Sequence, residues 1–369
     1  MILAFADDFS GAAEVAGVAH RYGLQAIVTT CSEIPENCEF VAFDMATRSM
    51  TEDQASAKAL VCGKLAAHLS PTLLYKKTDS VLRGHLAIEL SAMLSSTGRS
   101  LGLLVPANPA RNRTISNGVY RIEDIPLIDT EFARDPVFPI HSSQVKDLVL
   151  GAESLAIGAS LPKSGLVVGD AVTERDLEHW AERTNDAILP AGASPFLAAL
   201  LRARGEHVLG QVEPNDLCER RILLVCGSQS DNSRHITKSL RKAGAPVFET
   251  SDDSIDEFAK RIADSIAMHP VTVLRHPREA SDSPEELTSQ ITAIVNRVLE
   301  LHTGMPPHLC LEGGETAASV LQRLGEKRFQ VTHEGEPGVV TLASDRQLLA
   351  TVKPGSYRWP AKLLGFESS

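Results

Sequence analysis

Short apolar runs alternate with longer segments of helical period through the first half of the chain. A short apolar run is typical of a buried strand, whereas apolar residues recurring every three or four positions indicate one face of a helix. The expected strands are residues 2–5, 26–29, 40–43, 73–75, 101–105 and 166–168. The expected helices are residues 12–19, 53–68, 82–95, 173–184 and 194–203. This alternation indicates βαβ units and a mainly parallel sheet.

The second half repeats the pattern after a polar, irregular stretch. Its expected strands are residues 222–226, 246–249, 271–274, 308–311 and 328–332, and its expected helices are residues 232–242, 254–267, 284–302 and 315–323. We therefore predict an α/β protein: two α/β domains with mainly parallel sheets and an interdomain active-site cleft. The predicted bounds are 1–205 for the first domain, 206–220 for a linker and 221–369 for the second domain.

Composition narrows the class of protein. The chain has 369 residues, of which 43% are hydrophobic and 22% charged, so it can bury two cores without disulfide bonds or structural metal ions. Its formal net charge of −11 argues against general nucleic-acid binding, which depends on basic groups that neutralise phosphates. The six cysteines form no CxxC pair, so the sequence signals neither a zinc site nor a disulfide framework. With no signal peptide and no apolar run long enough to span a membrane, a cytoplasmic protein is expected.

Two adjacent carboxylates, Asp7 and Asp8, stand where the first expected strand turns into a helix. In an open α/β sheet, ligands bind at the carboxyl ends of the strands, so both side chains would project into a binding crevice. The alternative interpretation is structural: one carboxylate caps the helix and the other is solvated.

A cluster of cations, hydroxyls and an acid follows the strand at 73–75. It comprises Lys76, Lys77, Thr78, Asp79, Ser80 and Arg83, and Arg48 lies shortly after another strand of the same predicted edge. Arginine binds carboxylates through paired donors and lysine supplies a compact charge, so the cluster suits a small hydroxylated acid. A solvated charged face is the competing interpretation. Two polar, proline-containing loops, 106–118 and 130–136, are either functional or held by their own hydrogen bonds.

Glycine turns end two strands of the second half. Gly227-Ser228 follows one strand, Gly313-Gly314-Glu315-Thr316 follows another, and a helix begins after each. Glycine lets a phosphate approach the backbone, and a helix N-terminus offers N–H groups with partial positive charge. Together the turns indicate a nucleotide phosphate site, to which residues 353–355 would add a third wall. Taken alone, each turn is more often only a tight turn, and for the pair this structural interpretation competes with the phosphate site. Neither turn matches the P-loop or the GxGxxG pattern.

In this order, the segments resemble those of the four-carbon acid sugar kinase family, whose members phosphorylate threonate, erythronate or 3-oxo-tetronate. The matching stretches are 6–12, 47–48, 76–84, 106–118, 192–194, 227–230, 313–317, 337–338 and 353–355. The resemblance implies an acid-sugar-binding domain followed by a nucleotide-binding domain. It also implies that Asp8, Arg48, Lys77, Thr78, Asp79 and Ser80 contact the substrate, and that Ser228, Gly313, Gly314, Glu315, Thr316 and Gly355 contact ATP.

We therefore predict an ATP-dependent kinase of a four-carbon sugar acid, with Asp8 as the first choice of base, Asp79 as the second and Arg83 as a stabiliser of developing charge. Mg²⁺ is expected because phosphoryl transfer depends on positioning and charge neutralisation; the sequence does not identify its ligands. The expected partners are the small acid and ATP, with neither nucleic acid nor membrane, and a homodimer is left open.

The chain departs from the family pattern at Glu315, where aspartate is usual, and at residues 356–359, where a glycine-rich segment is usual. The bulky residues at 357–359 motivate an alternative function, a non-catalytic acid-sugar sensor with an impaired nucleotide site. An oxidoreductase is a weaker alternative because the dinucleotide fingerprint is absent from the sequence.

Overall fold

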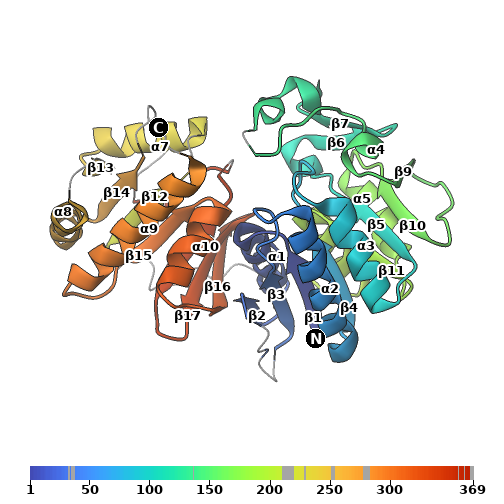
Figure 1. The fold of residues 1–369 in the computed structure, drawn as a ribbon, viewed down its shortest axis with the longest axis horizontal. Helices are drawn as coiled ribbons and strands as arrows, with labels where there is room; N and C mark the ends of the chain where they lie inside the picture. Colours follow the sequence, from blue (N-terminus) through green and yellow to red (C-terminus); the bar gives the residue numbers. More distant parts are fainter. Residues whose placement is uncertain are drawn as a thin grey trace. The chain divides into compact units, whose positions relative to one another are not determined.

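The computed structural model describes residues 1–31, 34, 38–135, 137–209, 220–227, 230–250, 254–276, 283–355, 357–360 and 362–365. The chain divides into two compact units (Figure 1). Unit 1 comprises Met1–Leu24 and Ile34–Leu209, and unit 2 comprises Gln25–Glu33 and Gly210–Ser369.

Unit 1 is built on a parallel sheet in the strand order β3-β1-β4-β11-β5-β10-β9. The strands are β1 (Ile2–Ala6), β3 (Phe40–Asp44), β4 (Leu73–Lys77), β5 (Leu101–Val105), β9 (Ala152–Leu155), β10 (Gly165–Gly169) and β11 (Ile188–Gly192). Every residue of β1, β3 and β5 is buried, which explains why these strands read as continuous apolar runs.

Helices pack on this sheet in two groups. The helices are α1 (Phe9–Arg21), α2 (Glu52–Leu69), α3 (Leu86–Thr97), α4 (Val145–Leu148), α5 (Glu174–Glu182) and α6 (Ser194–Ala203). Helix α2 packs against α3, whereas α6 packs against both α1 and α5. Side-chain caps begin several of these helices: Thr51 and Gln54 form a capping box on α2, and Thr173 and Asp176 form another on α5.

A small antiparallel sheet, β6-β7-β8, also belongs to unit 1. Its strands are β6 (Arg113–Ser116), β7 (Val119–Ile122) and β8 (Ile125–Pro126), and three short 3₁₀ helices flank it at Pro109–Arg111, Leu127–Asp129 and Glu131–Arg134. The polar loops at 106–118 and 130–136 are therefore largely ordered structure in the residues described.

Unit 2 has a mixed sheet in the order β13-β14-β12-β15-β18-β17-β16-β2, parallel from β13 to β18 and antiparallel beyond. Its strands are β2 (Ala26–Thr29), β12 (Ile222–Cys226), β13 (Val247–Glu249), β14 (Val271–Arg275), β15 (His308–Glu312), β16 (Arg328–Glu336), β17 (Val339–Ser344) and β18 (Leu349–Lys353). Its helices are α7 (Asp231–Lys242), α8 (Ile255–Met268), α9 (Pro284–Leu301) and α10 (Gly314–Arg323).

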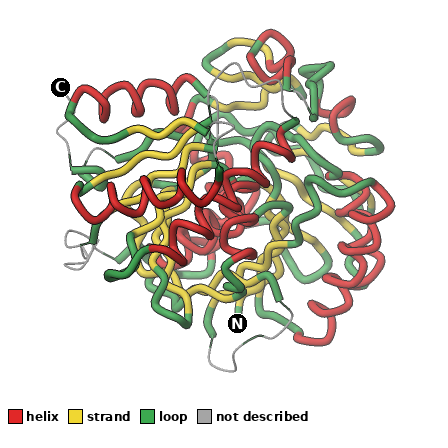
Figure 2. Tube along the Cα trace, turned by 60° about the vertical axis from the view of Figure 1, so that its left-hand side comes forward, coloured by secondary structure: helices red, strands yellow, loops and turns green. Residues whose placement is uncertain are grey.

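Helix α9 packs against both α8 and α10, whereas apolar residues of α7 share a core cluster with Trp359 and Leu364. Helices (red) accompany the strands (yellow) throughout the described chain in Figure 2. The α/β prediction with mainly parallel sheets is thus confirmed. Among the described residues, no helix is both long enough and apolar enough to cross a membrane.

The structure differs from the predicted pattern in three ways. The helix expected at 82–95 begins only at Leu86, because residues 78–85 form an irregular loop. The strand at 26–29, placed in the first predicted domain, hydrogen-bonds to β16 and belongs to unit 2. Strands β9, β11, β17 and β18, and the small sheet of β6, β7 and β8, were not expected. Most of the predicted linker, residues 210–219, lies outside the described residues.

Candidate functional site

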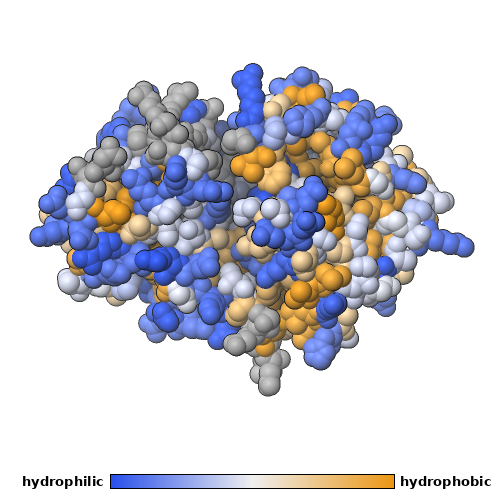
Figure 3. Space-filling model, in the orientation of Figure 1, coloured by the Kyte–Doolittle hydropathy of each residue, from blue (hydrophilic) through white to orange (hydrophobic). Residues whose placement is uncertain are grey.

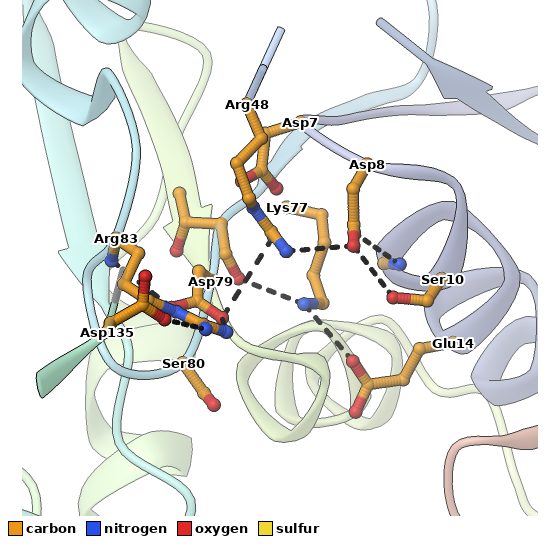
Figure 4. Close-up of polar contacts among 12 residues, drawn as sticks. Asp7, Asp8, Ser10, Glu14, Arg48, Lys77, Asp79, Ser80, Arg83 and Asp135 are labelled. Atoms are coloured by element: carbon orange, nitrogen blue, oxygen red, sulfur yellow. Dashed lines mark hydrogen bonds and ion pairs between the residues drawn. The ribbon is translucent and has the colours of Figure 1, made fainter. Parts of the chain in front are cut away.

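The carboxyl ends of three neighbouring strands in unit 1 bring the acidic pair and the cation cluster together. Strand β1 lies between β3 and β4, with Ala6 in register with Asp44 on one side and Lys77 on the other. The residues that follow these strands therefore meet at one edge of the sheet, as Figure 4 shows for Asp7, Asp8, Lys77 and Asp79.

Asp8 is the N-cap of α1. Its Oδ1 accepts a hydrogen bond from the backbone N–H of Gly11 at 2.7 Å, and its Oδ2 accepts one from Ser10 Oγ at 2.8 Å. The capping interpretation thus holds for Asp8. It fails for Asp7, which is only 1% exposed rather than solvated.

Arg48 joins the two carboxylates. Its Nε donates to Asp7 Oδ2 at 2.9 Å, and its Nη1 donates to Asp8 Oδ2 at 2.8 Å (Figure 4). Its Nη2 also lies 4.0 Å from Asp79 Oδ1. One planar guanidinium therefore fixes the orientation of both carboxylates, which a lysine could not do.

The loop after β4 is organised around Asp79 and Arg83. Arg83 donates from Nε to Asp79 Oδ2 at 2.8 Å and from Nη2 to Asp79 Oδ1 at 3.0 Å, a bidentate pair. Its Nη1 donates to Asp135 Oδ2 at 2.9 Å. Leu82, between them, has a φ of 65°, a strained value for a branched residue that is typical of functional loops.

Lys77 is turned toward α1. Its Nζ lies 3.1 Å from Glu14 Oε2 and donates to Thr78 O at 2.9 Å, while Glu14 Oε1 accepts from Ser194 Oγ at 2.8 Å. Lys76 is fully buried and pairs with Glu89 at 2.7 Å. Because successive strand residues alternate in direction, only Lys77 of these two lysines belongs to the cluster around Asp8.

Hydroxyls and strand β6 complete the cluster. Arg113 donates to Ser80 Oγ, and the hydroxyl of Tyr120 donates to Ser80 O. Asp7 Oδ1 and Thr78 Oγ1 are buried and have no hydrogen-bond partner among the described residues. Unpartnered buried polar atoms are unusual, and these two offer an acceptor and a hydroxyl to a polar ligand.

Charges within the cluster move two carboxyl pKa values in opposite directions. Burial alone would raise the pKa of Asp79, but the nearby Arg83 and Arg48 outweigh it and hold that pKa well below its usual range. Burial raises the pKa of Asp44 to about 7; the Ala46 N–H opposes this shift, and the charges of Asp8 and Asp7 add to it. Asp79 is thus a poor base at neutral pH, whereas Asp44 exchanges a proton there.

Of the sequence-predicted residues of unit 2, those that the structure describes lie at the carboxyl ends of β15 and β18. Gly313, the N-cap of α10, has a φ of 95°, a conformation that favours glycine. Its N–H donates to Lys353 O at 3.0 Å, which joins the start of α10 to the end of β18. Thr316 is buried and Glu315 is exposed on this turn.

Gly227, directly after β12, packs closely on α10. A Cβ atom at Gly227 would lie 1.9 Å from Thr316 Oγ1 and 3.0 Å from Glu312 O, so only glycine fits. Gly355 accepts a hydrogen bond at its carbonyl oxygen from Ser230 Oγ at 3.1 Å. Ser228 lies outside the described residues.

The structure therefore places the predicted acid-site residues, from Asp8 to Arg83, in one cluster of unit 1. It places Gly313, Gly314, Glu315, Thr316 and Gly355 at one edge of the unit 2 sheet.

Sequence reasoning missed Asp44, Glu14 and Asp135. Asp44 directly follows a predicted strand, which was an available signal; Glu14 and Asp135 gave none. In the part of the chain that the structure describes, no three Asp, Glu, His or Cys side chains are grouped to hold a metal ion.

Comparison with known proteins adds independent findings. Residues 2–200 match the family model described as "Sugar-binding N-terminal domain". A D-threonate kinase from Salmonella typhimurium is 26% identical, covering 91% of this chain and 89% of its own. A D-erythronate kinase from Heliobacterium modesticaldum is 26% identical, covering 94% and 90%. A crystal structure from Salmonella typhimurium LT2 shares the fold with a TM-score of 0.78 at 19% identity, covering 98% of this chain and 97% of that one.

Proposed function

Because the chain belongs to the four-carbon acid sugar kinase family and is therefore a phosphotransferase with a hydroxyl acceptor, we propose that it phosphorylates threonate, erythronate or 3-oxo-tetronate with ATP. The observation that carries the proposal is the cluster at the strand ends of unit 1, inside the matched sugar-binding region. There Arg48 joins Asp7 to Asp8, and Lys77 and Arg83 lie on either side.

The cluster suits a hydroxy acid because it offers both charges. Arg48, Lys77 and Arg83 supply donors for a carboxylate, while Asp7 and Asp8 accept hydrogen bonds from hydroxyls. A ligand with only an acidic group would use half of these partners. We propose that Arg48, Lys77, Thr78, Asp79 and Ser80 bind the substrate together with Asp8.

We propose Asp8 as the residue that orients and deprotonates the attacking hydroxyl. Its Oδ2 already accepts two hydrogen bonds, from Ser10 and Arg48, so it is held in place before a substrate arrives. Asp79 is the weaker candidate, since its low pKa opposes proton transfer at neutral pH. Arg83 is proposed to stabilise the charge that develops during transfer.

We propose that ATP binds unit 2, with its phosphates at Gly313–Thr316 and Gly355 and at Ser228 of the neighbouring turn. Support comes from the tight packing of Gly227 on α10 and from the positive φ of Gly313. Both glycines lie beside the N-terminus of α10, where a phosphate can approach the backbone. Mg²⁺ bound to the phosphates would neutralise their charge. It would rely mainly on phosphate oxygens and water, since no three-ligand group is present in the described residues.

The test is a panel of four-carbon acids with Mg-ATP, assayed by ADP release and by the mass of the product. Asp8→Asn should lower turnover by about 10²-fold or more while leaving Mg-ADP binding unchanged. The matched control is Asp129→Asn, because Asp129 is exposed and lies outside the cluster. Unchanged turnover in Asp8→Asn would remove Asp8 from the mechanism.

A non-catalytic sensor is the second candidate function, because bulky residues at 357–359 follow the turn at which the phosphates are proposed to bind. Tyr357 and Trp359 are buried, and Trp359 joins a core cluster of unit 2, so the two rings are built into the fold. Calorimetry distinguishes the two functions: a sensor binds a tetronate but gives no heat with Mg-ATP, whereas the kinase binds both.

We also propose a cytoplasmic location, where ATP is available, and a homodimer. The homodimer is supported by exposed apolar side chains of unit 1, where Val61 is 61% and Leu150 is 75% exposed. In Figure 3, apolar residues (orange) gather on the visible face over α2 and α3. Light scattering of the purified chain tests this assembly.

A further inference from the structure

A buried charged network lies at the carboxyl ends of β15 and β18, where the turns that contain Gly313 and Gly355 begin. Glu312 and Lys353 are register partners at the ends of β15 and β18, and both side chains are 0% exposed. Lys353 Nζ lies 2.9 Å from Glu312 Oε2. A charge pair this deeply buried is costly to desolvate, so it is weak evidence for stability and calls for another role.

Trp359 completes the network. Its Nε1 donates to the same Glu312 Oε2 at 3.0 Å, and its ring centroid lies 5.2 Å from Lys353 Nζ. The indole therefore contacts both charges, with a hydrogen bond to the anion and a cation–π contact to the lysine. Trp359, one of the residues that depart from the family pattern, therefore contacts the last residue of β15 and the last residue of β18.

The network extends into each of the three turns. Lys353 Nζ also donates to Pro354 O at 3.2 Å, which holds the start of the turn that contains Gly355. The carbonyl of Lys353 accepts the N–H of Gly313 at 3.0 Å, which places the N-cap of α10. Ser230 Oγ donates to Gly355 O and accepts the N–H of Ser233 at 3.2 Å, which connects the turn after β12.

We propose that Trp359, Glu312 and Lys353 form a positioning network for the nucleotide site, an inference that rests on the proposed function of unit 2. Lys353 is neutralised by Glu312 and fully buried, so it does not contact the phosphates. Its role is to hold the Pro354–Gly355 turn and the start of α10 in the arrangement that receives them. Trp359 keeps this pair together and covers it.

The main test is Trp359→Phe, which keeps an aromatic ring over Lys353 but removes the N–H donor to Glu312. A hydrogen bond to a charged group contributes enough that its loss should raise the Kd for Mg-ADP and the KM for ATP about tenfold. The KM for the acid should stay within about twofold, because unit 1 is untouched. Trp180→Phe is the control: Trp180 is buried in unit 1 and donates to Asp170 O, so nucleotide affinity should not change.

A second variant covers the case in which Trp359→Phe does not fold. Glu312→Gln is nearly isosteric and keeps an acceptor for the indole, but it removes the counter-charge of Lys353. It should raise the Kd for Mg-ADP by a similar factor. Trp180→Phe also leaves Trp359 as the sole tryptophan, whose emission should change on addition of Mg-ADP and not on addition of the acid.

The outcomes separate the two proposals. Wild-type nucleotide affinity in folded Trp359→Phe or Glu312→Gln overturns the network while leaving the kinase intact. Equal rises of the KM for ATP and of the KM for the acid also overturn it, because they indicate a change that is not specific to the nucleotide turns. A wild-type chain that binds no Mg-ADP refutes the proposed function itself, and the network with it.

Discussion

Asp44→Asn tests the electrostatics of the cluster around Asp7 and Asp8, at one of the residues that were not predicted from the sequence. Asp44 ends β3, is 4% exposed, and accepts the N–H of Ala46 on Oδ1 at 2.8 Å. Burial raises its pKa to about 7, well above the ordinary range of an aspartate, and the charges of Asp8 and Asp7 add to that shift. Asparagine keeps the acceptor for Ala46 and removes the ionisable group.

The sign of the effect follows from proton binding. Below about pH 4 the carboxyl is protonated in both the folded and the unfolded chain, so it makes no pH-dependent contribution. Between about pH 4 and pH 7 the folded chain keeps a proton that the unfolded chain has released, and stability is lost as the pH rises. With a pKa of about 7 in the folded chain and about 4 in the unfolded chain, at ~1.4 kcal/mol per pH unit, the total loss is about 4 kcal/mol at most and is complete just above pH 7.

The assay is calorimetric unfolding of the full chain at pH 5 and pH 8. Of the total loss, about 3 kcal/mol falls between these two pH values. At about 2–4 °C per kcal/mol, the wild-type Tm should fall by about 6–12 °C more than the Tm of Asp44→Asn over this interval. Asp129→Asn, which alters an exposed carboxylate, should follow the wild type. The same pH dependence in wild type and Asp44→Asn would refute the assignment of a raised pKa to Asp44.

Two further predictions concern ion pairs of unit 1. Lys76→Met leaves the charge of Glu89 buried without its partner, which lies 2.7 Å away in the wild type, and should lower the free energy of unfolding by about 3–5 kcal/mol. The double variant Lys76→Met, Glu89→Leu should recover most of that loss, and urea titrations of both variants measure it. Asp135→Asn weakens the 2.9 Å contact to Arg83, a pair with 25% and 16% of its side chains exposed, so the KM for the acid should rise only about fivefold while the KM for ATP stays unchanged. A full loss of activity in Asp135→Asn would contradict this modest role.

The carboxyl edge of the unit 1 sheet could be predicted because polar residues stand where the apolar runs stop. Asp7 directly follows β1 (Ile2–Ala6), β4 (Leu73–Lys77) ends in two lysines, and parallel strands place those ends side by side. The partners could not be predicted in the same way. Arg48 and Asp7 are 41 residues apart, so their hydrogen bond depends on the packing of β1 against β3.

Strand β11 shows a second limit of pattern reasoning. Its sequence, Ile188–Gly192, contains Pro190, and proline lacks the N–H that a central strand needs. The strand nonetheless lies between β4 and β5, where only Ala191 and Gly192 pair with β4. The helix expected from residue 82 failed for a related reason: Arg83 is held by Asp79, and the positive φ of Leu82 delays the helix to Leu86.

The pairing of cations with carboxylates in unit 1 bears on specificity. Arg48, Lys77 and Arg83 each contact a carboxylate of the cluster, so an anion gains less from net charge than the sequence suggested. What the pairing provides is orientation, since each guanidinium is held by its carboxylate before a ligand arrives. A ligand that supplies an anion and hydroxyl donors together can satisfy both halves of these pairs, whereas a simple anion must compete with Asp8 and Asp79 for their partners. We therefore expect the cluster to bind a hydroxy acid more tightly than an acid of equal charge without hydroxyls.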